Sequence, residues 1–128
     1  MKLLLDSHAF IWWDEQPTRL GPSANRACFD PANELLLSVA SVWEIQIKVM
    51  LAKLRLGKPL RQMIADQVER NGLEILAVSL EHALRLDSLP SLHKDPFDRL
   101  LIAQAVIEGA ALVTHDRAIA QYPVPVIW

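Results

Sequence analysis

Short apolar runs alternate with longer segments of helical character along this chain. The apolar runs are three to five residues long, a length that suits strands buried on both faces. Alternation of strands with helices is typical of a parallel sheet that is covered by helices. We therefore expect an α/β fold with a central, mostly parallel sheet of about five strands, at residues 3–5, 35–37, 74–78, 111–114 and 124–127.

Capping residues and glycine stops mark the helices between these strands. Proline is favoured in the first turn of a helix and glycine just after its end, while serine and aspartate are favoured N-caps. The strongest case is residues 95–109, which open with Asp95 and Pro96 and end at Gly109. The same signals predict helices at residues 22–29, 42–53, 59–71 and 79–86.

The chain is short enough for one domain and apolar enough to have a buried core. It has 128 residues, of which 52% are apolar, and an average domain has roughly 150 residues. Its single cysteine, Cys28, excludes an intramolecular disulfide and a cysteine metal cage. We expect a single domain over residues 1–128 in a reducing compartment.

The start of the chain and its charge limit where it acts and what it binds. The apolar run Leu3–Leu5 is interrupted by Asp6 and is too short for an export signal, and no apolar run approaches the roughly 18 residues of a membrane span. We expect a cytoplasmic protein with no membrane partner. The net charge of −2 argues against binding nucleic acid by overall charge, but it permits local contacts.

The segment 42–53 is apolar on more than one helical face. Val42, Ile45 and Val49 form one stripe, and Trp43, Ile47, Met50 and Leu54 form another. We favour the interpretation that both apolar faces of this helix are buried inside the protein. The alternative is that one face is offered to a second chain. The adjacent Trp12 and Trp13 raise the same question, because neighbouring helical residues point about 100° apart.

Four acids from distant segments can share one crevice. Asp6 and Asp116 follow predicted strands, and the carboxyl ends of parallel strands form the edge where ligands bind. Glu44 and Asp98 lie in predicted first turns of helices that can begin at the same edge.

Each acid also has an ordinary structural explanation. Asp6 and Asp116 can be N-caps, and Ser41 with Glu44 fits a capping box. Asp95 caps the next helix, which leaves Asp98 without a capping role. If every acid were structural, the chain would be a non-catalytic α/β interaction module, and this alternative stays open.

Acids that converge need a positive partner. Two carboxylates in close contact repel by about 4 kcal/mol at an effective dielectric near 20, and no lysine or arginine adjoins Asp6 or Glu44 in the sequence. Oxygen ligands with water favour Mg²⁺ or Mn²⁺. Such an ion can lower the pKa of water that attacks a phosphodiester.

Four segments together resemble the PIN-domain nucleases, and among them the VapC-type ribonuclease toxins of bacterial toxin–antitoxin pairs. They cover the chain from end to end, in the order and spacing of the family: residues 3–13 (LLLDSHAFIWW), 38–45 (SVASVWEI), 93–105 (HKDPFDRLLIAQA) and 112–116 (LVTHD). The resemblance implies a three-layer α/β/α domain and a Mg²⁺- or Mn²⁺-dependent endoribonuclease of a type II toxin–antitoxin system.

The resemblance also implies roles for individual residues. The acidic quartet around one or two ions would be Asp6, Glu44, Asp98 and Asp116, with Asp6 and Asp98 as the strongest direct ligands. Ser7 and Thr114 would orient ligands or phosphate from behind the acids. Water would attack phosphorus in line and leave a 5′-phosphate and a 3′-hydroxyl. Expected partners are RNA, a second copy of the chain, and a cognate VapB-type antitoxin that blocks the groove.

Basic residues and histidines near the acids complete the candidate site. Phosphate contacts are expected from Lys48, Lys94, Arg99 and Arg117, although most charge runs are only solvated faces. His8, His93 and His115 also lie near the acids, but lone histidines more often have packing roles. A metal-dependent phosphatase is a weaker alternative, since the dehalogenase-like type needs a second Asp where His8 stands.

Overall fold

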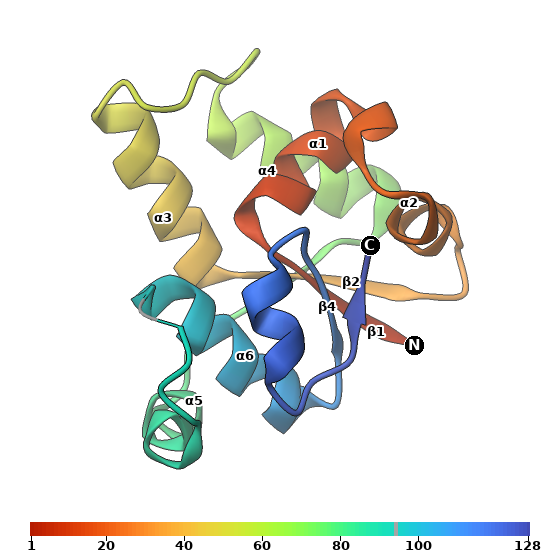
Figure 1. The fold of residues 1–128 in the computed structure, drawn as a ribbon. Coiled ribbons are helices and arrows are strands. Elements are labelled where there is room, and N and C mark those ends of the chain that lie inside the picture. The colour runs from red at the N-terminus through yellow and green to blue at the C-terminus, as the bar shows by residue number, and fades with distance from the viewer. Residues whose placement is uncertain (94) are drawn as a thin grey trace.

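The computed structural model of the chain describes residues 1–93 and 95–128 (Figure 1). Its strands are β1 (Lys2–Leu5), β2 (Glu34–Ser38), β3 (Glu74–Leu76), β4 (Ala111–Val113) and β5 (Val126–Ile127). Its α-helices are α1 (Ser7–Glu15), α2 (Pro22–Phe29), α3 (Val39–Met50), α4 (Leu60–Asn71), α5 (Leu80–Leu84) and α6 (Pro96–Glu108). Three short 3₁₀ turns are η1 (Pro17–Arg19), η2 (Arg85–Ser88) and η3 (Arg117–Gln121).

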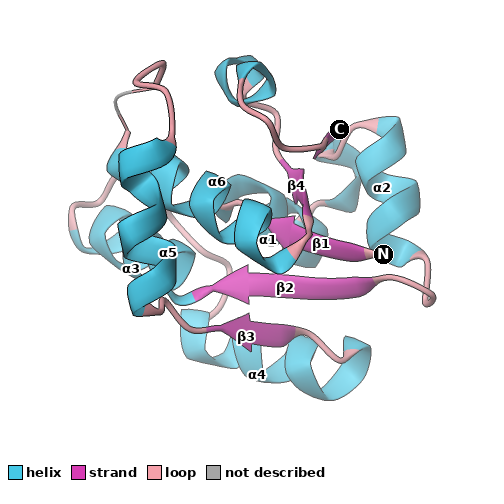
Figure 2. Cartoon of the chain, turned by 90° about the horizontal axis from the view of Figure 1, so that it is seen from below, coloured by secondary structure: helices cyan, strands magenta, loops and turns pink. Residues whose placement is uncertain are grey.

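The five strands form one parallel sheet in the order β3-β2-β1-β4-β5. β1 is central, and Leu3 pairs with Leu35 on one side and with Ala111 on the other. Because all strands run the same way, their carboxyl ends meet at one edge, as the arrows of β1, β2 and β3 show in Figure 2. The predicted α/β class is confirmed, and Asp6 follows β1 at this edge.

Helices cover both faces of the sheet, which confirms the three-layer architecture. Side chains alternate along β1, so that Leu3 and Leu5 pack on one face and Leu4 on the other. α1, α2 and α4 cover the first face, and α6 covers the second (Figure 1). Leu3, Leu4 and Leu5 are completely buried, as expected for a central strand.

Two strands differ from the expectation at the sheet edges. β3 ends at Leu76 rather than Val78, and Ile75 is 44% exposed. β3 pairs only with β2, so it is an edge strand, and the prediction that every strand is buried on both faces is wrong here. β5 is also shorter than predicted and begins at Val126.

α3 begins and ends three residues earlier than predicted. Its N-cap is Ser38, whose hydroxyl accepts a hydrogen bond from the backbone N–H of Ala40 at 3.0 Å. The predicted capping box at Ser41 is therefore wrong, because Ser41 already lies inside the helix. Glu44 consequently lies in the second turn, where it cannot serve as a cap.

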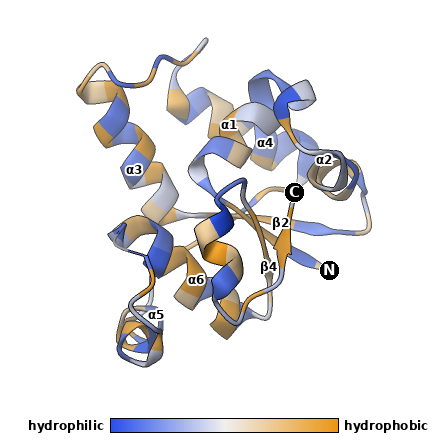
Figure 3. Ribbon diagram, viewed as in Figure 1, coloured by the Kyte–Doolittle hydropathy of each residue, from blue (hydrophilic) through white to orange (hydrophobic). Residues whose placement is uncertain are grey.

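One face of α3 is exposed rather than buried. Ile45 is fully buried, but Trp43 is 62% exposed and Met50 is 83% exposed. Figure 3 shows hydrophobic segments along α3 although the helix stands at the side of the molecule. The interpretation that both apolar faces of this helix are buried is therefore wrong. Of the two adjacent indoles, Trp13 is buried and Trp12 is only half-buried.

Most predicted stops and caps of the other helices are confirmed, but α5 ends at Leu84, two residues earlier than predicted, and continues as the 3₁₀ turn η2. Asp95 accepts hydrogen bonds from the N–H groups of Phe97 and Asp98 at the start of α6. Gly72 and Gly109 end α4 and α6 with positive φ angles of 66°, a conformation that favours glycine. None of the helices within the described chain has the length and hydropathy that a bilayer crossing requires.

Candidate metal centre

The four acids from distant segments face one cavity at the carboxyl edge of the sheet. The cavity has a volume of about 320 Å³, and its lining comprises Asp6, Ser7, His8, Trp12, Glu44, Lys48, Asp95, Asp98, His115 and Asp116. A larger cavity of about 720 Å³ lies between the end of α3 and the start of α4, and none of the described residues that line it is an acid. Volume therefore does not identify the site, whereas the gathering of carboxylates does.

Asp6 and Asp116 act as helix caps and also face the cavity. One oxygen of Asp6 accepts the N–H of Ala9 at 2.8 Å, and one oxygen of Asp116 accepts the N–H of Ala118 at 2.9 Å. Each cap uses one carboxylate oxygen, so the second oxygen is left for other partners. The structural and the chemical explanations of these two acids are thus compatible.

Glu44 is held from both sides by Ser7 of α1 and Lys48 of α3. The Ser7 hydroxyl donates to Oε1 of Glu44, and Nζ of Lys48 lies 3.1 Å from Oε2. The absence of a lysine next to Glu44 in the sequence was misleading, because residues four apart are neighbours on a helix. Ser7 contacts an acid of the site, in keeping with its expected orienting role.

Thr114 connects the first and last acids of the site. Its hydroxyl oxygen accepts the N–H of Asp116 at 3.1 Å, and its side chain hydrogen-bonds to the carboxylate of Asp6. The residue is 1% exposed, at the end of β4. Its position agrees with the role predicted for it, behind the two acids.

Burial and mutual repulsion raise the pKa values of two of the acids. Burial raises the pKa of Asp6, against the opposing effect of its hydrogen bonds to Thr114 and Ala9. Burial, with the neighbouring carboxylate of Asp95, raises the pKa of Asp98 to about 7. Among the described residues that line the cavity, acids outnumber cations even with Lys48 counted, which is the electrostatic condition for binding a cation.

His93 contacts two of the four acids. Its Nε2 lies 2.8 Å from Oδ2 of Asp116 and 3.2 Å from Oδ2 of Asp98. The hydrogen bond to Asp116 raises the pKa of His93. Burial acts to raise the pKa of Asp116, but the hydrogen bonds from His93 and Ala118 outweigh it and hold that pKa below its usual range.

The ring orientation of His93 is fixed by the backbone. The N–H of Asp95 points at Nδ1 of His93 at 3.1 Å, so Nδ1 is an acceptor and the proton belongs on Nε2. This geometry favours the neutral ring of His93, whereas the hydrogen bond to Asp116 raises the pKa of His93 and favours the charged ring. In either charge state Nε2 carries a proton that it donates to Asp116.

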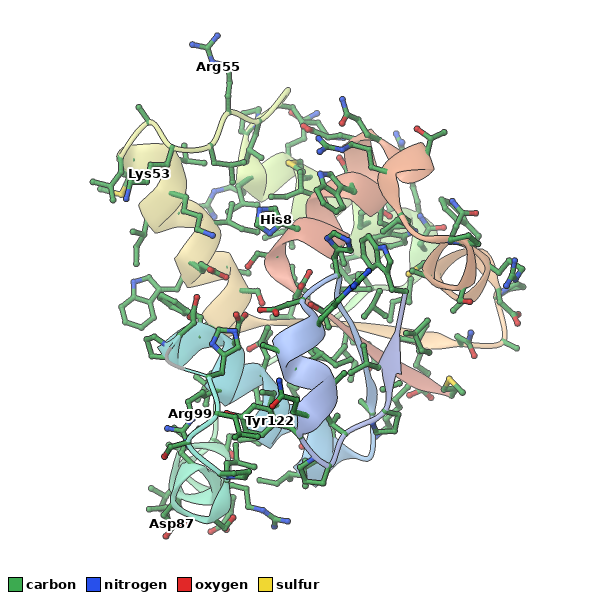
Figure 4. All side chains as sticks on the ribbon, in the orientation of Figure 1. His8, Lys53, Arg55, Asp87, Arg99 and Tyr122 are labelled. Carbon is green, nitrogen blue, oxygen red and sulfur yellow. The ribbon has the colours of Figure 1, made fainter. Side chains whose placement is uncertain are left out.

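The basic residues predicted to contact RNA have different environments. Lys48 lines the cavity, and Arg117 is exposed at the start of η3. Arg99 is directed away from the cavity, since its Nη2 donates to the carbonyls of Leu86 and Leu89, and Figure 4 shows it on the α5 side of α6. The structure therefore corrects the prediction for Arg99, and Lys94 lies outside the described residues.

Two residues gain importance from the structure. The sequence placed His93 near the acids but gave no sign that it touches them, and Tyr122 carried no signal at all. His8 and His115 line the cavity, and Figure 4 shows His8 projecting from α1. His93 could be recognised from sequence only by its place two residues before the capping Asp95.

The donor set suits a hard divalent cation. Carboxylate and hydroxyl oxygens dominate the cavity, and no cysteine lines it, so the chemistry favours Mg²⁺ or Mn²⁺ over a soft metal. Asp98 and Asp116 each place a carboxylate oxygen, and His93 a ring nitrogen, within 4.8 Å of one another. The raised pKa values of Asp6 and Asp98 support the fit independently.

Comparisons with known proteins agree with this arrangement. The family model described as "PIN domain" matches residues 3–125. Ribonuclease VapC22 of Mycobacterium tuberculosis is 33% identical over 98% of this chain and 98% of its own length. Two solved structures share the fold: VapBC2 from Rickettsia felis bound to a promoter DNA fragment, and a toxin–antitoxin complex from Klebsiella pneumoniae.

The structural matches are extensive. The Rickettsia felis chain has a TM-score of 0.74 at 19% identity, with 98% of this chain and 97% of that chain covered. The Klebsiella pneumoniae chain has a TM-score of 0.61 at 18% identity, with 98% and 96% covered. At these identities the matches concern the fold.

Proposed function

The chain belongs to the PIN-domain family, and we propose that it is an endoribonuclease toxin that hydrolyses RNA with a Mg²⁺ or Mn²⁺ ion in its acidic cavity. The family expected from the sequence is confirmed. The observation that carries the chemical proposal is the convergence of Asp6, Glu44, Asp98 and Asp116 on one cavity. Glu44 matters most against the non-catalytic alternative, because it is not a helix cap.

The free oxygen atoms suggest which acids bind the ion directly. Both oxygens of Glu44 and both oxygens of Asp116 already have protein partners. Asp98 uses only Oδ2 in contacts with other described residues. Asp6 accepts the N–H of Ala9 and a hydrogen bond from Thr114, but both partners are neutral and leave its negative charge for an ion. Asp6 and Asp98 are therefore the direct ligands in this proposal, and Glu44 and Asp116 bind directly or through water.

A bound divalent cation would supply a water of lowered pKa and would stabilise negative charge on the phosphate oxygens. The residues of this chain supply the rest. Ser7 and Thr114 hold the acids in place, and Lys48 offers a positive charge at the cavity to a phosphate. Because the chain has a net charge of −2, these local contacts must hold the RNA.

The proposed partners are a VapB-type antitoxin and a second copy of the chain. Two observations support them: the similarity to a chain of a toxin–antitoxin complex, and the apolar face of α3, defined here as Trp43, Ile47, Met50 and Leu51. Large exposed apolar side chains on one helix face are typical of an interface.

RNA cleavage by the purified chain tests the activity. We expect cleavage of single-stranded RNA in Mg²⁺ or Mn²⁺, none in excess EDTA, and recovery when the metal is returned. Asp98→Asn should abolish cleavage, whereas Asp87→Asn, the same change at an exposed acid far from the cavity (Figure 4), should leave it intact. Cleavage by Asp98→Asn at the wild-type rate in saturating metal would remove Asp98 from the mechanism.

A further inference from the structure

The segment before α6 is held in place by a buried tyrosine. Tyr122, which follows η3, is 4% exposed. Its hydroxyl oxygen accepts the backbone N–H of Leu92 at 3.1 Å and that of His93 at 2.8 Å. Figure 4 shows Tyr122 reaching toward this segment. One side chain thus fixes the backbone that carries His93.

The ring of His93 in turn connects two acids from different elements. Asp98 lies in the first turn of α6, and Asp116 caps η3. The Nε2–H of His93 donates to Oδ2 of Asp116 at 2.8 Å, and Nε2 also lies 3.2 Å from Oδ2 of Asp98, while the N–H of Asp95 fixes the ring from the opposite side. One imidazole therefore lies in contact with both carboxylates and sets the distance between them.

We propose that His93, held by Tyr122, is a positioning residue that sets the spacing of Asp98 and Asp116 for the cation. This inference rests on the proposed function. By engaging Oδ2 of both acids, His93 leaves Oδ1 of Asp98 as the oxygen available to an ion. Outer hydrogen-bond partners of this kind orient metal ligands and commonly alter metal affinity by about 10- to 100-fold.

The alternative, that His93 is itself a metal ligand, conflicts with its hydrogen bonds. A ligand nitrogen must be unprotonated, so Nε2 would have to give up its proton. In a neutral ring the proton would then lie on Nδ1, facing the N–H of Asp95 at 3.1 Å. Two donors would point at each other. The tautomer that the backbone selects is the one that donates its Nε2–H to Asp116.

Direct Mn²⁺ binding to RNA-free protein tests the proposal. His93→Ala should weaken the affinity for Mn²⁺ about 10- to 100-fold. His93→Gln can return a donor N–H and should recover most of the loss. Tyr122→Phe removes only the hydroxyl and should weaken affinity by a smaller factor, and combining it with His93→Ala should add nothing further. Ser88→Ala, which removes a hydroxyl hydrogen bond in nearby η2, is the control and should have no effect.

Each outcome bears on the proposal. Unchanged affinity in His93→Ala and Tyr122→Phe would overturn it. So would histidine nitrogen coupling in the electron paramagnetic resonance spectrum of the wild-type Mn²⁺ complex that disappears in His93→Gln, since His8 and His115 also line the cavity. If His93→Ala does not fold, Tyr122→Phe decides the question alone. If the wild-type protein binds no Mn²⁺ and cleaves no RNA, the proposed function fails as well. If the wild-type protein binds Mn²⁺ and the variants bind it equally well, only the positioning role of His93 fails.

Discussion

Asp98 is an acid whose ionisation is costly in the absence of a cation. Burial and the nearby Asp95 raise its pKa to about 7, while contact with His93 works in the opposite direction. Its pKa in an unfolded chain is near 3.8. The native state therefore binds this proton more tightly than the unfolded state between these two values, and its stability falls as the pH rises through that range.

Asp98→Asn should relieve this cost in metal-free protein. Above pH 7 we expect the variant to be as stable as the wild type or more stable, by about 1 to 2 kcal/mol after allowance for solvent screening. The advantage should shrink as the pH falls from 7 toward 4, because the wild-type carboxyl is then protonated. Denaturant unfolding of both proteins in EDTA at pH 5 and pH 8 measures this difference in the free energy of unfolding. If the variant is less stable than the wild type by more than about 2 kcal/mol at pH 8, Asp98 has a structural role instead.

Lys48 should weaken the binding of the metal ion and strengthen the binding of RNA. Its ammonium lies 3.1 Å from Glu44, so it competes with a cation for the same carboxylate. Lys48→Met should tighten Mn²⁺ binding about fivefold, in line with the loss of about 1 kcal/mol of charge repulsion, and should raise KM for RNA. Lys2→Met, at the exposed start of β1 and therefore at the opposite edge of the sheet, is the control. Weaker Mn²⁺ binding in Lys48→Met would contradict this view of the lysine.

At the scale of the element, α3 shows where sequence signals are ambiguous. Ser38 and Ser41 both precede apolar residues, and only Ser41 has a Glu three residues later, so the pattern favoured the wrong cap. The chain instead leaves β2 and enters α3 at once. The ends of α4 at Gly72 and of α6 at Gly109 were predictable, because the positive φ angle that ends a helix in this way strongly favours glycine. The exposure of β3 was not, because an edge and a central strand differ by their neighbours and not by local pattern.

The two serines give a matched test of where α3 begins. Ser38→Ala should lower the free energy of unfolding by about 1 kcal/mol, as is typical for loss of an N-cap. Ser41→Ala should be neutral or stabilising, since the buried Ser41 hydroxyl has no hydrogen-bond partner among the described residues. Chemical denaturation of both variants measures the difference. A larger loss of stability in Ser41→Ala than in Ser38→Ala would show instead that Ser41 is the N-cap.

At the scale of the whole molecule, the sheet topology assembles the site. β1, β2 and β4 are adjacent and parallel, so Asp6, the start of α3 and Asp116 meet at one edge. This convergence was predictable from the order of strands and acids. The contacts of His93 were not, because they depend on how Tyr122 anchors a loop some 30 residues away. Long-range side-chain contacts of this kind leave no periodic trace in a sequence.

The exposed apolar face of α3 should govern association. We expect the wild-type chain to sediment as a dimer, or as a complex when its antitoxin is present. Met50 is 83% exposed, so Met50→Glu should change the free energy of unfolding by less than about 0.5 kcal/mol. It should nevertheless weaken association at least about tenfold, because a buried charge without a partner is costly at an interface. Leu84→Glu, at a 53% exposed position on α5, makes the same kind of change outside this face and should leave sedimentation unaltered. A wild-type chain that stays monomeric at high concentration would contradict the dimer, and equal effects of both substitutions would show that α3 is not the contact surface.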